Sequence, residues 1–181
     1  SVDLNSTTIL DNVYGGGNEG AVTKNTEVFV TNGKISNNLF AGGNGVNAVV
    51  YGNSTITIDG TTEVGTSDSV APNSGCVFGA GNAADSGSTD SASTATVNIV
   101  GATIHGNVYG GPKMAIVNGK TQTNIGSKAV KDSNLVEGDI IISGTVFGGG
   151  ESNANGSETY DWNFISVTGG TNVEINGNDY I

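Results

Sequence analysis

The residues of this chain that could carry acid–base chemistry are its carboxylates, since 17 Asp and Glu residues stand against six lysines and no arginine. A glycosidase needs two carboxyl groups about 5 to 9.5 Å apart across the bond it cleaves. Asp59, Asp139 and Glu174 lie in strand-like segments, but in separate ones, and the chain has no adjacent Asp-Asp pair. We therefore expect no converged catalytic set and predict that the protein is not an enzyme.

Calcium is the metal ion that this composition favours, because carboxylates and the backbone carbonyls of Gly-Asn turns are the hard oxygen ligands it prefers. The nonapeptide calcium repeat requires Gly-Gly-x-Gly-x-Asp, and that pattern is missing from the chain. Weak candidate ligands remain in two places, Asp85 with Asp90, and Asp132 with Glu137 and Asp139. We expect no other cofactor.

His105 and Cys76 are the only residues of their types and could in principle act as a base and a nucleophile. His105 follows Ile104 in an extended segment, so its side chain should point to the opposite face, at the surface. Cys76 directly precedes Val77 and has no evident His partner, and one cysteine makes neither an internal disulfide nor a zinc site. We expect structural positions for both residues.

An aromatic cluster near the C-terminus is the candidate ligand surface. Tyr160, Trp162 and Phe164 alternate with polar residues, so an extended strand would place the three rings on one face. Such a strip could stack on the apolar faces of a neutral polysaccharide, as in a carbohydrate-binding domain. It could instead cap the apolar end of the fold, which must not be left open to pairing with other chains.

Charge and composition narrow the class of protein. A formal net charge of −11 at pH 7 disfavours nucleic-acid phosphates and anionic membranes as partners. No apolar run is long enough to span a membrane, and we expect any secretion signal to have been removed or to lie outside this segment. Within 181 residues, 20 Val and 14 Ile against four Leu and one Met favour strands over helices.

A repeat organises the chain. Each copy joins a branched residue, an aromatic residue and a glycine-rich corner, and the copies begin at residues 13, 39, 77, 108 and 146, which are 26, 38, 31 and 38 residues apart. Four copies have an isoleucine four residues before the branched residue, whereas the third has Asn73 there. These isoleucines are Ile9, Ile35, Ile104 and Ile142.

Alternating segments at 27–30, 55–60, 96–99 and 172–177 accompany the repeat and predict strands with one buried and one wet face. We predict an all-β fold, a single-stranded parallel β-helix (β-solenoid) of about five coils, about 24 Å long at about 4.8 Å per coil. It would form one domain over residues 1–181, a fragment of a larger chain, with long loops at 61–76, 83–93 and 113–138. A β-propeller or a sandwich is the alternative.

Stacked coils would align the residues of the repeat in rows. The branched residues should fill the interior, and Asn18, Asn44 and Asn82 should form an amide ladder that stops where Pro112 and Glu151 replace asparagine. The aromatic residues should form either a sugar-stacking stripe or a row buried under a loop. This row comprises Tyr14, Phe40, Phe78, Tyr109 and Phe147.

The aromatic-Gly-Gly-Gly-Asn corner after an isoleucine strand resembles the Gly-rich repeats of large bacterial cell-surface, adhesin-like proteins, which belong with the right-handed, pectate-lyase-like parallel β-helices. The resemblance runs from Ile9 to about Ile175 and implies a right-handed coil. The lyases of that class need an Arg or Lys base beside a calcium-holding acidic cluster. This chain has no arginine, and its lysines fall mostly in turns or loops.

These observations together predict a non-catalytic rigid stalk or adhesive module of a secreted or surface-anchored bacterial protein. Its partners would be a glycan or a host-surface molecule and neighbouring domains of the same polypeptide. The alternative is a carbohydrate-binding domain, and a polysaccharide-degrading enzyme comes third. Ice binding is disfavoured, because Glu27, Asn98 and Glu174 interrupt the threonine rows that it would need.

Overall fold

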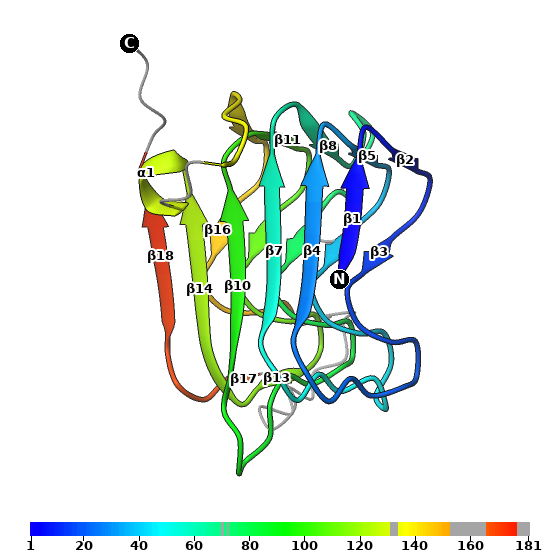
Figure 1. Cartoon of the computed structure of the whole chain (residues 1–181), viewed down its shortest axis with the longest axis vertical. Coiled ribbons are helices and arrows are strands. Elements are labelled where there is room, and N and C mark those ends of the chain that lie inside the picture. Colours follow the sequence, from blue (N-terminus) through cyan, green and yellow to red (C-terminus); the bar gives the residue numbers. More distant parts are fainter. Residues whose placement is uncertain (70, 72, 131–133, 153–165, 177–181) are drawn as a thin grey trace.

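The chain folds into parallel β-sheets, shown in Figure 1. The computed structural model describes residues 1–69, 71, 73–130, 134–152 and 166–176. Sheet A is the longest, and its strands follow one another across the front of Figure 1 in sequence order, all pointing the same way. They are β1 (Val2–Asn5), β4 (Thr26–Thr31), β7 (Ser54–Asp59), β10 (Ser93–Ile99), β14 (Gly119–Ile125) and β18 (Thr171–Ile175).

Two sheets of short strands lie behind sheet A and repeat the same order. Sheet B contains β2 (Thr8–Ile9), β5 (Lys34–Ile35), β8 (Thr62–Val64), β11 (Ala102–Ile104) and β15 (Ile140–Ile142). Sheet C contains β3 (Val13–Tyr14), β6 (Leu39–Phe40), β9 (Val77–Phe78), β12 (Val108–Tyr109) and β16 (Val146–Phe147). A fourth, smaller sheet pairs β13 (Ile116–Val117) with β17 (Ser166–Val167). The chain thus passes through sheets A, B and C in turn and then returns to A, as a parallel β-solenoid does.

The register places equivalent residues of the repeat opposite one another. The branched residues pair in the series Val13, Leu39, Val77, Val108 and Val146 across sheet C. The alternating strands of sheet A turn residues such as Val28, Ile56 and Val97 toward the same interior. One apolar cluster therefore runs between the three sheets and holds them together.

Two segments differ from the sequence-based expectation. The stretch 113–138, expected as a loop, contains β13, β14 and the short helix α1 (Ser127–Val130). The inward positions of β14 are Gly119, Thr121, Thr123 and Ile125, and only the last is a large apolar residue, so the segment lacks the alternation of apolar residues that reveals a strand. In the third copy Val64, and not Asn73, pairs with Ile35 and Ile104, because the inserted loop begins after this residue.

Helix is scarce in the part of the chain that the structure describes. No helix there is long and apolar enough to cross a membrane.

Candidate functional site

The aromatic residues of the repeat form a continuous stack on sheet C. Neighbouring ring centroids are 4.7 to 5.0 Å apart, and the planes of neighbouring rings lie within 9° of each other. The strand spacing sets this distance, because each ring extends from the same position of the next strand. The series runs through Tyr14, Phe40, Phe78, Tyr109 and Phe147.

The middle of this aromatic stack is closed to ligands. Phe40, Phe78 and Tyr109 are at most 4% exposed, and Cys76 and Ala71 of the inserted loop pack against them. Only the end rings face solvent to a larger extent, since Phe147 is 42% exposed and Tyr14 is half-buried. The three central rings are therefore packed under a loop and offer no stripe for sugar stacking.

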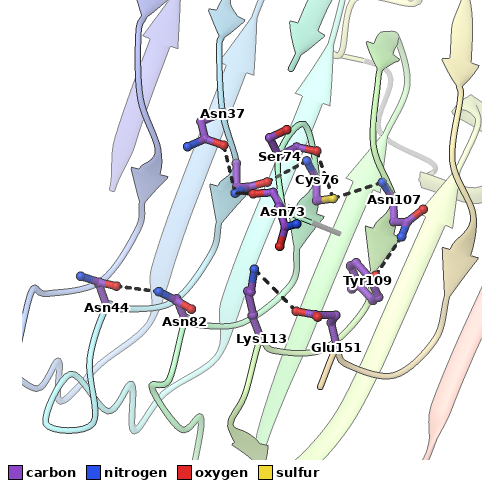
Figure 2. A network of polar contacts seen from close by, with 11 residues as sticks. Asn37, Asn44, Asn73, Ser74, Cys76, Asn82, Asn107, Tyr109, Lys113 and Glu151 are labelled. Carbon is purple, nitrogen blue, oxygen red and sulfur yellow. Dashed lines mark hydrogen bonds and ion pairs between the residues drawn. The ribbon is translucent and has the colours of Figure 1, made fainter. Parts of the chain in front are cut away.

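An amide ladder runs along the glycine-rich corner, and Figure 2 shows its bond between Asn44 and Asn82. The Asn44 Nδ2 donates to Asn18 Oδ1 at 2.8 Å, and Asn82 Nδ2 donates to Asn44 Oδ1 at 2.9 Å. Each amide thus satisfies the one before it in the chain. The corner glycines permit this approach, since a Cβ on Gly42 would lie 2.6 Å from the backbone nitrogen of Gly81.

A buried ion pair continues the amide ladder after Asn82. The residue in register with Asn82 is Lys113, and not Pro112 as the sequence suggested, because the fourth copy keeps the full repeat length. Lys113 Nζ lies 3.7 Å from Glu151 Oε2 and 6.0 Å from the ring centroid of Phe78. Burial raises the pKa of the Glu151 carboxyl, against the opposing influence of Lys113.

A second polar ladder, which sequence reasoning missed, lies one residue before the branched position. We call one passage of the chain through sheets A, B and C a level. At each level a side-chain oxygen accepts a hydrogen bond from a backbone N–H of the next level. Asn12 accepts from Asn38, Asn38 from Cys76, and Asn107 from Thr145. Cys76 holds the same place, and its Sγ accepts the N–H of Asn107 at 3.3 Å (Figure 2). Asparagine at this position in three of the five copies was the signal that could have revealed it.

Sheet B carries a charged cluster on its outer face. Glu63 accepts from Lys34 Nζ at 3.0 Å through Oε2, and its Oε1 lies 3.0 Å from His105 Nε2. The hydrogen bonds from Lys34 first, and then from His105, lower the pKa of the Glu63 carboxyl. The side chain of His105 thus points outward, away from the buried Ile104, and contacts the carboxylate of Glu63 near the surface.

The outer face of sheet A is polar and carries amide pairs of its own. Asn124 donates to Asn98 at 2.9 Å, and Asn172 donates to Gln122 at 2.9 Å. A shallow groove of about 350 Å³ lies near the beginnings of β14 and β18, where Lys120, Gln122 and Asn172 contribute polar side chains. This groove offers hydrogen-bond donors and acceptors to a neutral polar ligand.

The carboxylates considered for catalysis hold separate positions. Asp59 is 5% exposed, and its Oδ2 accepts the N–H of Val136 at 3.0 Å, so it fixes a neighbouring loop. Asp139 lies just before β15, and Glu174 lies on β18, where it accepts from Asn176.

The calcium candidates show no shared site within the described residues. Asp85 accepts the N–H of Ile116 at 2.8 Å, while Asp90, Glu137 and Asp139 are exposed. No group of three or more His, Cys, Asp or Glu side chains within the described ranges could hold a metal ion. Asp132 lies outside those ranges, so calcium binding stays a prediction.

The aromatic platform predicted at Tyr160, Trp162 and Phe164 also lies outside the described residues.

No family model matches the chain, and searches of curated proteins and of solved structures found no match either. The resemblance to adhesin-like repeats is therefore an argument from the repeat alone.

Proposed function

We propose that this chain is a non-catalytic, rigid stalk or adhesive module of a secreted or surface-anchored bacterial protein. The observation that carries the proposal is the aromatic stack from Tyr14 to Phe147, together with the amide ladder beside it. The aromatic and amide side chains of the repeat contact the equivalent side chains of the neighbouring levels. These contacts stiffen the rod along its axis, and the same side chains are then not available to bind or act on a substrate.

The architecture within this proposal is a single-stranded, right-handed coil of about five turns. It is supported by the strand order, in which β1, β2 and β3 precede their neighbours β4, β5 and β6 in sheets A, B and C respectively. The right hand agrees with the twist preference of L-amino-acid strands and with the rule for parallel crossovers. Rigidity then follows, because bending the rod would have to open backbone bonds in several sheets at once.

The test combines the gene and the protein. The reading frame around this segment is expected to continue the aromatic-glycine corners and to end in a surface anchor. The purified chain, incubated with uronic and neutral polysaccharides, is expected to release no products. Turnover that disappears in Asp59→Ala or Asp139→Ala would overturn the proposal in favour of an enzyme.

The second candidate is a carbohydrate-binding domain, and the groove on sheet A favours it. Lys120, Gln122 and Asn172 could donate and accept hydrogen bonds along a neutral glycan, while the net charge of −11 would repel acidic polymers. A screen of neutral glycans by titration calorimetry, a readout that the Trp162→Ala variant keeps, tests both this groove and the predicted aromatic platform. Binding lost in Gln122→Ala would place the ligand in the groove, and binding lost only in Trp162→Ala would place it on the platform.

A further inference from the structure

Lys113 differs from the other lysines of the described chain, which are exposed. Its side chain is only 14% exposed, and hydrogen bonds hold its backbone on both sides. Its N–H donates to the carbonyl of Gly81 at 2.9 Å, and its carbonyl accepts the N–H of Ala83 at 2.8 Å. These two bonds flank Asn82, so Lys113 and Asn82 lie side by side on neighbouring levels. The fold thus fixes an amine beside a side-chain amide.

The ammonium group of Lys113 lies between two levels. Its Nζ is 3.7 Å from Glu151 Oε2 on the following level and 6.0 Å from the ring centroid of Phe78 on the preceding level. Phe78 and Asn82 belong to the same copy of the repeat, so Nζ is close to the level of Asn82 as well. Figure 2 shows the lysine side chain between Asn82 and Glu151.

The side-chain carbonyl of Asn82 is turned toward this lysine. In the amide ladder each Nδ2 donates to the earlier level and each Oδ1 faces the later one. Asn44 Oδ1 accepts from Asn82 in this way, whereas the row continues from Asn82 with Lys113. Asn82 Oδ1 is buried and makes no hydrogen bond with any described residue. The amide carbon of Asn82 is therefore next to the amine and tied to nothing on that side.

An amine, an amide and a carboxylate in this order can carry out amide exchange. An amine attacks a carbonyl carbon only after it has lost a proton, and an adjacent carboxylate can take that proton. Burial raises the pKa of the Glu151 carboxyl, which makes its carboxylate a stronger base than an exposed one. Because the fold holds the groups together, the attack needs no collision in solution.

We propose that Lys113 and Asn82 become joined by an amide bond within the chain, and that Glu151 transfers the protons. Glu151 first takes a proton from Lys113 Nζ, and the neutral amine attacks Asn82 Cγ. Glu151 then passes this proton to Asn82 Nδ2 and takes a second proton from Nζ. The Cγ–Nδ2 bond breaks and ammonia leaves, so that an Nζ–Cγ amide bond and a protonated Glu151 remain. No oxidant or reductant takes part.

The products of this step suit their surroundings better than the reactants do. Lys113 and Glu151 begin as a charged pair whose removal from water is costly, and both end as neutral groups. The nitrogen that leaves is the one that donates to Asn44, so one hydrogen bond of the ladder is exchanged for a covalent bond. The bond forms once and has no turnover. It goes beyond the stalk role, which does not depend on it.

The experiment is accurate mass spectrometry of the intact 181-residue chain, with its folding checked by circular dichroism. Wild type is expected to weigh less than its sequence by one ammonia molecule. An asparagine can also lose ammonia by closing on its own backbone, so the bond must be located in peptides. A protease that cleaves before aspartate separates residues 68–84, which hold Asn82, from residues 90–131, which hold Lys113. These two peptides are expected to stay joined.

Variants of the three groups test their roles. Lys113→Arg keeps the charge but lacks a nucleophilic amine, and Glu151→Gln keeps the shape but lacks the base, so both should have the full mass of their sequences. Asn82→Asp keeps the carbonyl carbon and should lose water in place of ammonia. Lys34→Arg is the matched control, because Lys34 pairs with Glu63 at the surface and its replacement should leave the loss of ammonia unchanged.

The wild-type chain alone decides the question, so no variant has to fold. Folded wild type that keeps its full sequence mass and yields separate peptides after long incubation would rule the bond out. Loss of water with a link between Lys113 and Glu151 would also overturn the proposal, because the carboxylate would then be the group attacked. Joined peptides in Glu151→Gln would show that Glu151 does not transfer the protons.

Discussion

Cys76 occupies the position that asparagine holds in neighbouring copies of the repeat. Its sulfur accepts a backbone hydrogen bond there, as the amide oxygen does in those copies. Its Sγ accepts the N–H of Asn107, and its own N–H donates to Asn38 Oδ1. Burial raises the pKa of its thiol, so it stays protonated at neutral pH. The residue is therefore part of a ladder that satisfies backbone N–H groups.

Replacing Cys76 tests this ladder. Cys76→Ala leaves the N–H of Asn107 without an acceptor in a buried setting, which costs about 1 to 3 kcal/mol of unfolding free energy. Cys76→Asn restores the side chain of the neighbouring levels and should lose less. Thermal melts of the two variants measure the difference, and a Cys76→Asn protein less stable than Cys76→Ala would contradict the ladder.

Asn44 is the middle amide of the other ladder, and its removal breaks two bonds. Asn44→Ala deprives Asn18 of a donor and Asn82 of an acceptor, so we expect the unfolding free energy to fall by about 1 to 3 kcal/mol. Asn47→Ala is the control, since Asn47 is exposed and bonds only to Glu19 among the described contacts. Equal melting temperatures for Asn44→Ala and wild type would remove the ladder from the account of stability.

The sequence predicted the rows at residue level only where the repeat is unbroken. Asn18, Asn44 and Asn82 lie at the same distance after the branched residue of their copies, so their stacking follows directly from the repeat. The Cys76 ladder stayed hidden because cysteine and threonine interrupt its asparagines, and hydrogen bonding to backbone leaves no residue-type signature. Lys113 was overlooked because Pro112 looked like the end of the repeat.

At the scale of elements, the aromatic stack should contribute unequally along its length. Phe78→Ala empties a site that is 0% exposed between two rings, which costs about 3 to 5 kcal/mol. Phe147→Ala removes a ring with one stacking partner and should cost much less. Urea unfolding of both variants gives the comparison, and similar losses would mean that burial within the stack does not set its contribution.

The charged cluster on sheet B makes stability depend on acid. Lys34 and His105 lower the pKa of Glu63 below its ordinary value of 4.5. The cluster therefore contributes its full stabilisation at pH values above 4.5. Its contribution is lost as pH falls through the lowered pKa. Glu63→Gln should therefore be slightly less stable than wild type at pH 7, by under about 1 kcal/mol for so exposed a group.

The measurement is the difference in melting temperature between wild type and Glu63→Gln as a function of pH. The difference should shrink toward zero in acid, while other carboxylates affect both proteins alike. A difference that grows as the pH falls would contradict the direction of this pKa shift.

Element boundaries were predictable where alternation is strong and not where it fails. β4, β7, β10 and β18 match the alternating segments, since valine and isoleucine recur at their inward positions. β14 could not be found by hydrophobic pattern, because Thr121 and Thr123 point inward and Thr121 instead bonds to the carbonyl of Gly148. β14 is extended because it pairs with β10 and β18 on either side. These partners are distant in the sequence, so a pattern read over a few neighbouring residues does not contain this information.

At the scale of the whole molecule, stability should vary along the axis. Each level contacts only the levels beside it, so stability is close to a sum of intrinsic and nearest-neighbour contributions. Levels at the ends have one neighbour and exposed residues such as Ile175, whereas β7 and β10 have strands on both sides. Local opening should therefore begin at the ends and reach the middle last.

Amide hydrogen exchange followed by mass spectrometry tests this gradient. We expect the slowest exchange in β7 and β10, and the fastest in β1 and β18. Val77→Asp, which buries a carboxylate at a central position that is 0% exposed, should abolish the slow class throughout sheets A, B and C, because one apolar cluster supports all three. Uniform exchange along the chain, or a Val77→Asp protein with protected sheets, would show that the levels do not depend on one another as the shared interior requires.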